Sequence, residues 1–126
     1  MPLTRISLKH GKPVAYRRAI IDGVYQAMRE TFAVPEDDRF MAVSEFADGD
    51  FDYGRHYLGI ERSDDLVIIQ MTVSNTRTTL QKQALFKRIC ERLAESPGVR
   101  PEDVFINLVE VAKENWSFGH GIAQYA

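Results

Sequence analysis

The stretch LVIIQMTV, residues 66–73, decides the fold of this chain. All of its residues except Gln70 are apolar or β-branched, and such a run predicts a strand that is buried on both faces. Residues 79–94 follow with apolar side chains at the three-to-four-residue spacing of a helix. Residues 104–111 then predict another strand. The order strand, helix, strand predicts a β-α-β unit with parallel strands and a right-handed crossover.

The first half of the chain has the same order of elements. Residues 3–8 predict a short strand, and residues 14–33 carry apolar positions at helical spacing. Pro35 ends this helix, because proline cannot continue one. Residues 39–46 predict the closing strand. The two halves, about 1–62 and 63–126, are therefore interpreted as a duplication.

The turns that lead into the two closing strands also share letters. Pro35-Glu36-Asp37 precedes Phe40, and Pro101-Glu102-Asp103 precedes Phe105, 65 residues later. At the same separation Val43 matches Leu108 and Glu45 matches Glu110. We expect one domain over residues 1–126 with an α+β fold, in which two duplicated β-α-β units form a four-stranded sheet with both helices on one face.

Such a sheet leaves its other face bare. The apolar strand at 66–73 would then expose side chains that need a partner, and association of several copies is a natural way for a small domain to cover them. Residues 48–62, with three glycines among polar and aromatic residues, predict a hairpin or an extended excursion. Residues 116–121 are glycine-rich and aromatic and predict a short hairpin at a subunit edge.

Composition limits the function. The formal net charge is −2, from 16 basic and 18 acidic residues, which argues against a general nucleic-acid binder. Cys90 is the only cysteine, so no internal disulfide can form and a reducing compartment is expected. The chain has neither an apolar run of membrane-spanning length nor a signal-peptide core. We therefore expect a cytoplasmic protein.

Pro2 is the first candidate for chemistry. A methionine before a small residue is normally removed, and loss of Met1 would leave Pro2 as a secondary amine. Such an amine can act as a base, an acid or a nucleophile, and burial would lower its pKa. A proline at this position can equally do no more than begin a strand.

Several short motifs surround this proline. The chain resembles the tautomerase superfamily, and within it the malonate semialdehyde decarboxylase group. The resemblance rests on Met1-Pro2-Leu3, Phe32-Ala33-Val34-Pro35, Asp38-Arg39, Thr72-Val73-Ser74 with Arg77 and Gln81-Lys82, and Trp116-Ser117-Phe118-Gly119. It implies the fold of 4-oxalocrotonate tautomerase and MIF, a homotrimer that closes the bare sheet faces, a small oxo-acid substrate, and an active site at each proline with no metal and no organic cofactor.

Arg77 follows the 66–73 strand where the second helix begins, and Lys12 occupies the matching place 65 residues earlier. Sites in parallel sheets gather at the carboxyl ends of strands, and the planar guanidinium can hold a carboxylate by two bonds. The resemblance implies that Arg77 binds the substrate carboxylate. The alternative is a surface arginine paired with an acidic residue.

The resemblance also assigns other positions. Asp38 is implied to position or activate a water or to steer the protonation of Pro2, although by spacing alone Asp37 is an alternative and either could be a turn carboxylate. Trp116 and Phe118 are implied to wall the pocket, or else they pack at an interface. The decarboxylases have an Arg-x-Arg arrangement where this chain has Asn75-Thr76-Arg77. Asn75 could bind an amide, a hydroxyl or a carbonyl of the substrate.

Two classes of function remain open at this stage. An enzyme could use a cationic Pro2 to polarise a carbonyl in a decarboxylation, with hydration as a side activity, or a neutral Pro2 to move a proton in a tautomerisation. Alternatively, a non-catalytic binding or structural trimer could keep the fold without the chemistry, as it must if Met1 is retained. The scattered histidines show no metal-ligand spacing, and no metal site is expected.

Overall fold

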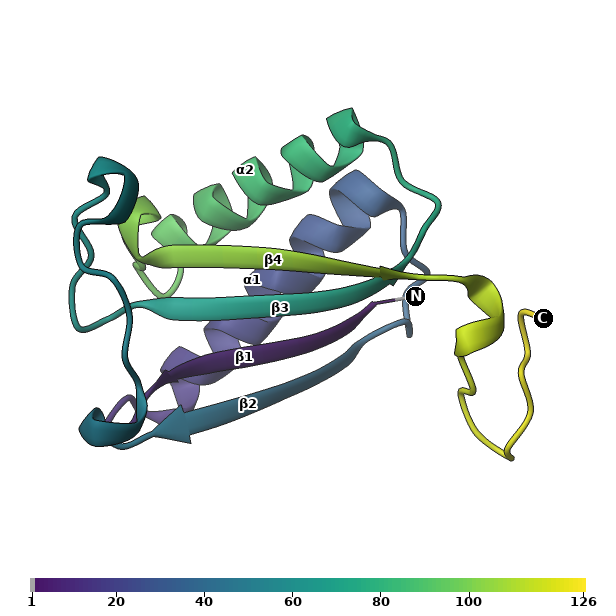
Figure 1. The fold of residues 1–126 in the computed structure, drawn as a ribbon, viewed down its shortest axis with the longest axis horizontal. Coiled ribbons are helices and arrows are strands. Elements are labelled where there is room, and N and C mark those ends of the chain that lie inside the picture. Colours follow the sequence, from purple (N-terminus) through teal and green to yellow (C-terminus); the bar gives the residue numbers. More distant parts are fainter. Residues whose placement is uncertain (1) are drawn as a thin grey trace.

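A four-stranded mixed sheet forms one layer of the molecule, and two helices form the other (Figure 1). The computed structural model describes residues 2–126. The strand order is β2-β1-β3-β4, with β1 parallel to β2, β3 parallel to β4, and β1 antiparallel to β3. The predicted pair of β-α-β units is confirmed. The elements are β1 (Leu3–Lys9), α1 (Val14–Phe32), β2 (Phe40–Phe46), β3 (Val67–Ser74), α2 (Thr79–Glu95) and β4 (Val104–Val111).

The antiparallel pairing of β1 with β3 joins the two units. Leu3 lies opposite Thr72, and Ser7 lies opposite Ile68. The beginning of β1 therefore meets the end of β3, and the end of β1 meets the beginning of β3. Leu3 is also paired with Phe40 at the start of β2. One end of the sheet thus collects the start of β1, the start of β2 and the end of β3.

The hydrophobic core lies between the sheet and the two helices. Alternate residues of β3 point into it, as the two-residue period of a strand requires. Burying each aliphatic side chain of this size stabilises the fold by about 1.5–3 kcal/mol. The central members, each no more than 1% exposed, are Ile69, Met71 and Val73 of β3, Ile20, Val24 and Met28 of α1, and Leu85, Ile89 and Leu93 of α2.

The helix ends follow local signals in the sequence. The Thr78 hydroxyl accepts a hydrogen bond from the Gln81 backbone N–H, and the Gln81 side chain accepts one from the Thr78 backbone N–H. This reciprocal capping box begins α2. At the end of α1, Ala33 adopts a left-handed conformation with φ of 52°, and Pro35 follows two residues later. The predicted end of the first helix is confirmed to within one residue.

The outer face of the sheet has no helix over it (Figure 1). In the single chain Phe40, Phe105 and Val109 are among its exposed apolar residues. Gln70 of β3 is exposed as well, and Ile68 is half-buried. One face of the 66–73 strand is therefore bare in the single chain, as expected for a sheet with both helices on the same side.

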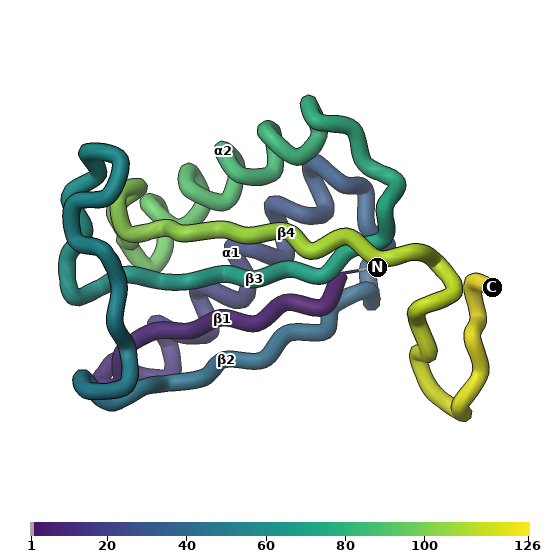
Figure 2. Tube along the Cα trace, in the orientation of Figure 1, coloured from purple at the N-terminus to yellow at the C-terminus, as the bar shows by residue number. Residues whose placement is uncertain are grey.

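The segment between β2 and β3 and the tail after β4 contain no regular strand or α-helix. The excursion between β2 and β3 contains no strand. Two short 3₁₀ turns, Asp48–Asp50 and Tyr57–Gly59, shape it instead. It crosses the end of the molecule away from the C-terminal tail (Figure 2). The tail after β4 forms a 3₁₀ turn at Lys113–Asn115 and then a loop without strands, so the predicted hairpin at 116–121 is wrong. Positive φ angles at Gly119 and Gly121 turn the chain there.

Shortening a side chain of α2 tests the core. Ile89→Ala should lower the free energy of unfolding by about 2–5 kcal/mol, because the site is fully buried and a cavity would remain. Lys87→Ala, an exposed position on the same helix, is the matched control and should change stability by about 0.5 kcal/mol or less. Chemical denaturation measures both. Equal losses for the two variants would contradict the core described above.

Candidate active site

Pro2 lies at the end of the sheet where three elements meet. It is buried, and it directly precedes Leu3, which pairs with Phe40 of β2 on one side and Thr72 of β3 on the other. The turn before β2 and the turn after β3 therefore flank it. Met1, whose removal would free the amine of Pro2, lies outside the described residues.

The turn before β2 supplies a buried carboxylate. Asp38 is 5% exposed, and its backbone N–H donates to the Pro35 carbonyl at 3.1 Å. Burial raises the pKa of the Asp38 carboxyl above its ordinary value, although the positive charge of Arg77 acts in the opposite direction. Asp37 beside it is exposed. Of the two carboxylates that spacing alone left open, the geometry favours Asp38 as the one that can take part in chemistry.

The turn after β3 supplies a half-buried cation. The Nη2 of Arg77 donates to the Phe32 carbonyl at 2.9 Å, and its Nη1 donates to Thr76 Oγ1 at 2.7 Å. The guanidinium carbon also lies 4.8 Å from the centre of the Phe32 ring. Within residues 2–126 no carboxylate lies at ion-pair distance from Arg77. The predicted alternative of a surface arginine paired with an acidic residue is therefore not the arrangement observed.

The remaining predicted residues lie along the same turn and the tail. Asn75 is exposed, and its backbone N–H donates to the Val111 carbonyl at 3.0 Å. The indole N–H of Trp116 donates to Ser74 Oγ at 3.0 Å. The Phe118 ring stacks on Trp116 with centroids 5.6 Å apart. Trp116 is thereby tied to the residue that precedes Asn75, and Phe118 stacks on Trp116.

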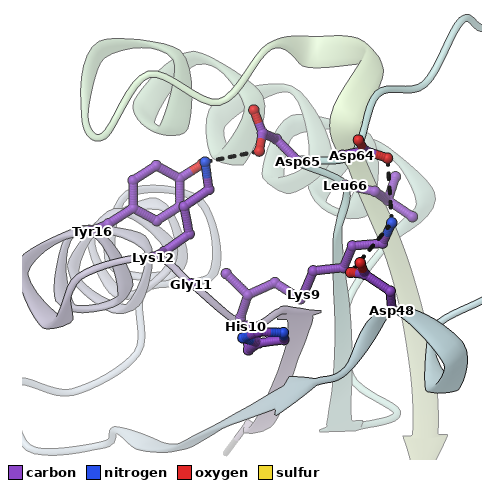
Figure 3. A pocket seen from close by; sticks show the side chains of 10 residues that line it. Lys9, His10, Gly11, Lys12, Tyr16, Asp48, Asp64, Asp65 and Leu66 are labelled. Atoms are coloured by element: carbon purple, nitrogen blue, oxygen red, sulfur yellow. Dashed lines mark hydrogen bonds and ion pairs between the residues drawn. The ribbon is translucent and has the colours of Figure 1, made fainter.

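A cavity of about 270 Å³ lies at the opposite end of the sheet (Figure 3). Lys9 and Lys12 line it, but each faces an aspartate. Lys12 Nζ lies 2.8 Å from Asp65, and Lys9 Nζ lies 3.3 Å from Asp64. These pairs neutralise both cations, so an incoming anion would have to displace a carboxylate. This cavity is thus a poorer anion site than the Pro2 end.

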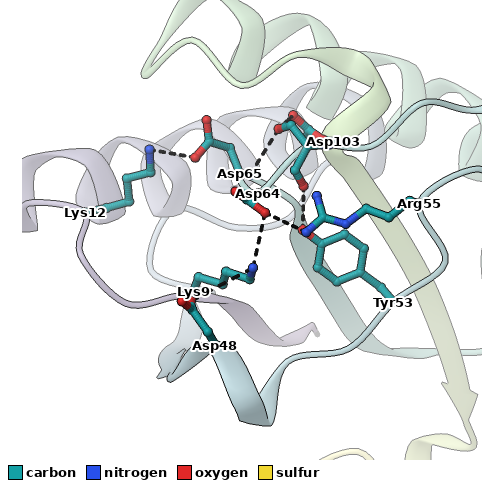
Figure 4. Close-up of polar contacts among 9 residues, drawn as sticks. Lys9, Lys12, Asp48, Tyr53, Arg55, Asp64, Asp65 and Asp103 are labelled. Atoms are coloured by element: carbon teal, nitrogen blue, oxygen red, sulfur yellow. Dashed lines mark hydrogen bonds and ion pairs between the residues drawn. The ribbon is translucent and has the colours of Figure 1, made fainter.

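The carboxylate that matches Asp38 in the second half is Asp103, and its surroundings differ (Figure 4). Its Oδ1 accepts the Ser63 backbone N–H at 2.8 Å, its Oδ2 accepts the Ser63 hydroxyl at 2.6 Å, and Arg100 Nε donates to it at 3.2 Å. Burial alone would raise the pKa of Asp103, but these bonds bring it below its ordinary value. Asp103 is therefore held ionised as a structural anchor.

The cation and the carboxylate at the two ends of the sheet have different partners. The Lys12 end has a paired cation and an anchored carboxylate, and Val67 stands where the first half has Pro2. The Pro2 end has a buried carboxyl of raised pKa and a cation held by neutral groups. Proton transfer combined with carboxylate binding fits the second arrangement.

Comparison with known proteins agrees with this geometry. Residues 38–119 match the model of a family described as tautomerase enzyme. The chain belongs to this family. It is a tautomerase-family enzyme similar to two proteins of Bacillus subtilis strain 168. One is the probable tautomerase YusQ, 40% identical over 124 residues and 98% of each chain. The other is the probable tautomerase YrdN, 31% identical over 125 residues, 99% of this chain and 96% of that protein.

Several solved structures share the fold of this chain. A malonate semialdehyde decarboxylase inhibited by 3-bromopropiolate is 41% identical, with a TM-score of 0.92 over 98% of this chain and 93% of that one. Another, described with decarboxylase and hydratase activities, is 32% identical, with a TM-score of 0.91 over 98% and 95%. A fused 4-OT described as a symmetric trimer shares the fold at 18% identity, with a TM-score of 0.80 over 98% and 97%.

Two contacts at this site were not predicted. The carbonyl of Phe32 holds Arg77, and the hydroxyl of Ser74 holds Trp116. Both link residues more than 40 positions apart, so no local pattern could indicate them. Across residues 2–126 no group of three or more His, Cys, Asp or Glu side chains could hold a metal ion, and no helix is long and apolar enough to cross a membrane.

Replacing Asp103 tests the structural role of the Lys12 end. Asp103→Asn should lower the free energy of unfolding at pH 7 by about 1.5–3 kcal/mol, the usual contribution of hydrogen bonds to a charged group. The lowered folded-state pKa adds stability above the unfolded pKa of about 3.9, which is lost as the pH falls through the folded value. The variant should therefore lose less stability on acidification than the wild type. Asp64→Asn, at an exposed aspartate, is the control and should cost less stability than Asp103→Asn, because solvent screens its ion pairs.

Proposed function

We propose that this protein uses the secondary amine of Pro2, after removal of Met1, to act on a small oxo acid. The observation that carries the proposal is the combination at one end of the sheet of Pro2, the buried Asp38 and an Arg77 that is bound only by neutral groups. The identity of 41% to a malonate semialdehyde decarboxylase supports a decarboxylase-like activity on a 3-oxo acid.

In this proposal Arg77 binds the substrate carboxylate. Its planar guanidinium matches the two carboxylate oxygens, and hydrogen bonds already fix its orientation. A cationic Pro2 donates an N–H to the carbonyl oxygen at C3. The C1–C2 bond then breaks, carbon dioxide leaves, and its electron pair forms an enolate that the Pro2 N–H stabilises and that takes a proton at C2. The balance needs no oxidant or reductant.

Asp38 is proposed to serve the water-dependent part of the chemistry. Because its pKa is raised, its carboxylate is a stronger base than an exposed one and can take a proton from a water that attacks the carbonyl carbon. A hydratase activity is one of the two activities ascribed to the relative that is 32% identical. Trp116 would exclude bulk water from one side and strengthen the charge interactions inside.

A tautomerase activity is the second candidate. It is favoured by the 40% identity to the probable tautomerase YusQ and by Asn75, which leaves one cation where the decarboxylases have two. A neutral Pro2 would then carry a proton between carbon and oxygen of an enol. The pKa of Pro2 separates the two roles, because a value near or below neutral favours the base and a higher one favours the acid. A non-catalytic trimer is the remaining alternative, and it requires that Pro2 stay in a peptide bond.

We also propose that three copies assemble through their outer sheet faces. Exposed Phe40, Phe105 and Val109 lie on β2 and β4, at the two edges of that face. Removing apolar surface from water contributes about 25 cal/mol of transfer free energy per Å², which favours association. A fold relative is described as a symmetric trimer.

The first test uses ¹H NMR with malonate semialdehyde and with phenylenolpyruvate. We expect wild type to convert at least one of them, and Pro2→Ala to lose about 100-fold or more in kcat, the contribution typical of a positioned acid or base. Intact mass first establishes that Met1 is absent from both proteins. Equal inertness of both proteins towards both substrates would leave the non-catalytic trimer as the better description.

The second test adds the missing cation. Asn75→Arg should raise kcat/KM for malonate semialdehyde by about 10-fold or more, because a second charged hydrogen bond would hold the carboxylate. Asn75→Gln, which alters the side chain without adding charge, is the matched control and should give no such gain. No gain for either variant, with the fold intact, would mean that Asn75 does not face the substrate carboxylate.

A further inference from the structure

Ser74 is a buried hydroxyl at the end of β3. It is 4% exposed, and it directly precedes Asn75 in the turn that leads to Arg77. Its Oγ accepts the indole N–H of Trp116 at 3.0 Å. A buried hydroxyl and an indole N–H each require a hydrogen-bond partner, and here each serves the other. The bond spans 42 positions in the sequence and joins the tail to the strand.

The tail beyond this bond is ordered by its own contacts. Phe118 stacks on Trp116, and Tyr125 meets the Phe118 ring edge-on at 5.0 Å. The Gln124 side chain accepts the Phe118 backbone N–H at 2.9 Å and donates to the Gly119 carbonyl at 3.0 Å. These bonds close the loop on itself. The tail can therefore be placed as a unit by whatever fixes its first aromatic ring.

Few hydrogen bonds of the described residues hold this unit to the sheet. The tail extends beyond the end of the sheet at which β1 begins (Figure 1). Among residues 2–126, the Ser74–Trp116 bond is the one hydrogen bond that ties residues 116–126 to a strand. Without it, the Trp116 ring could turn its N–H to water and move away from the Asn75–Arg77 turn.

We propose that Ser74 is a positioning residue that places Trp116, and through it the aromatic tail, against the Pro2 site. The proposal rests on the function proposed above. It assigns Ser74 an indirect role in substrate binding, through the Trp116 indole whose N–H its oxygen accepts, and no role in proton transfer. The ligand is the same short oxo acid. Because it is small, its affinity should be sensitive to a displacement of the Trp116 ring that bounds one side of the site.

A double-mutant cycle tests the bond itself. Ser74→Ala and Trp116→Phe each remove one partner and should each raise KM by about 3- to 10-fold, the effect of one neutral hydrogen bond, with kcat changed less than about 2-fold. The double variant should be no worse than the poorer single variant, since both lose the same interaction. Independent effects that multiply in the double variant would overturn the proposal.

Fluorescence gives a second readout of the same bond. Trp116 is the only tryptophan of the chain, so intrinsic emission reports on it alone. Ser74→Ala should shift the emission to the red and increase quenching by acrylamide, and Ser74→Thr, which restores the hydroxyl, should recover both emission and KM. Ser96→Ala, which removes an exposed hydroxyl at the far end of α2, is the matched control and should match wild type.

The two proposals fail in different ways. A wild type that is inert, and no more active than Pro2→Ala, defeats the proposed function. An active wild type whose emission and KM are unchanged in Ser74→Ala defeats only the role of Ser74. An active Ser74→Ala variant with altered emission and raised KM, but with the pH dependence of kcat unchanged, supports positioning.

Discussion

The antiparallel pairing of β1 with β3 is the constraint on which the rest of the molecule depends. In one β-α-β unit alone, the start of the first strand would have no residues of the other unit beside it. Antiparallel pairing of the two units brings the start of β1 beside the end of β3, with Leu3 opposite Thr72. Pro2 from one unit and the Ser74–Arg77 turn from the other are thereby brought to the same end of the sheet. Neither unit could form this end by itself.

The same pairing creates a second, matching end, and the sequence has made the two ends unlike. Lys12 and Asp103 occupy the places of Arg77 and Asp38 after a shift of 65 residues. At the Lys12 end, Lys12 is paired with Asp65 and Asp103 accepts hydrogen bonds from Ser63, which favours stability. At the Pro2 end a buried carboxyl is left with a raised pKa, which costs stability. Functional sites commonly retain such costs.

Much of the fold could be predicted because it follows from periodicity and from repeated order. The strand and helix ends were correct to within a residue or two, since Pro35 and the Thr78 capping box are local signals. The loops were predicted poorly. Glycines and aromatic residues in the 48–62 excursion and the tail fit several turn geometries, and side-chain bonds such as those of Gln124 decide among them.

The candidate site was predictable only in part. Pro2, Asp38 and Arg77 were identified through short motifs, and the structure brings the elements that carry them together. Which of Asp37 and Asp38 is buried depends on how the turn before β2 packs, and no spacing rule contains that information. The same is true of Ser74, because a serine at the end of an apolar strand gives no sign of its partner 42 residues later.

The way in which Arg77 is held has a consequence for the kinetics of binding. A guanidinium has five N–H donors, and the bonds to Phe32 and Thr76 occupy only two of them. An arriving anion therefore finds a cation whose orientation is already set and whose free donors need no exchange of partners. In the role proposed for Arg77, capture of a carboxylate would therefore require no salt bridge to break first, and encounter could lead directly to the bound state.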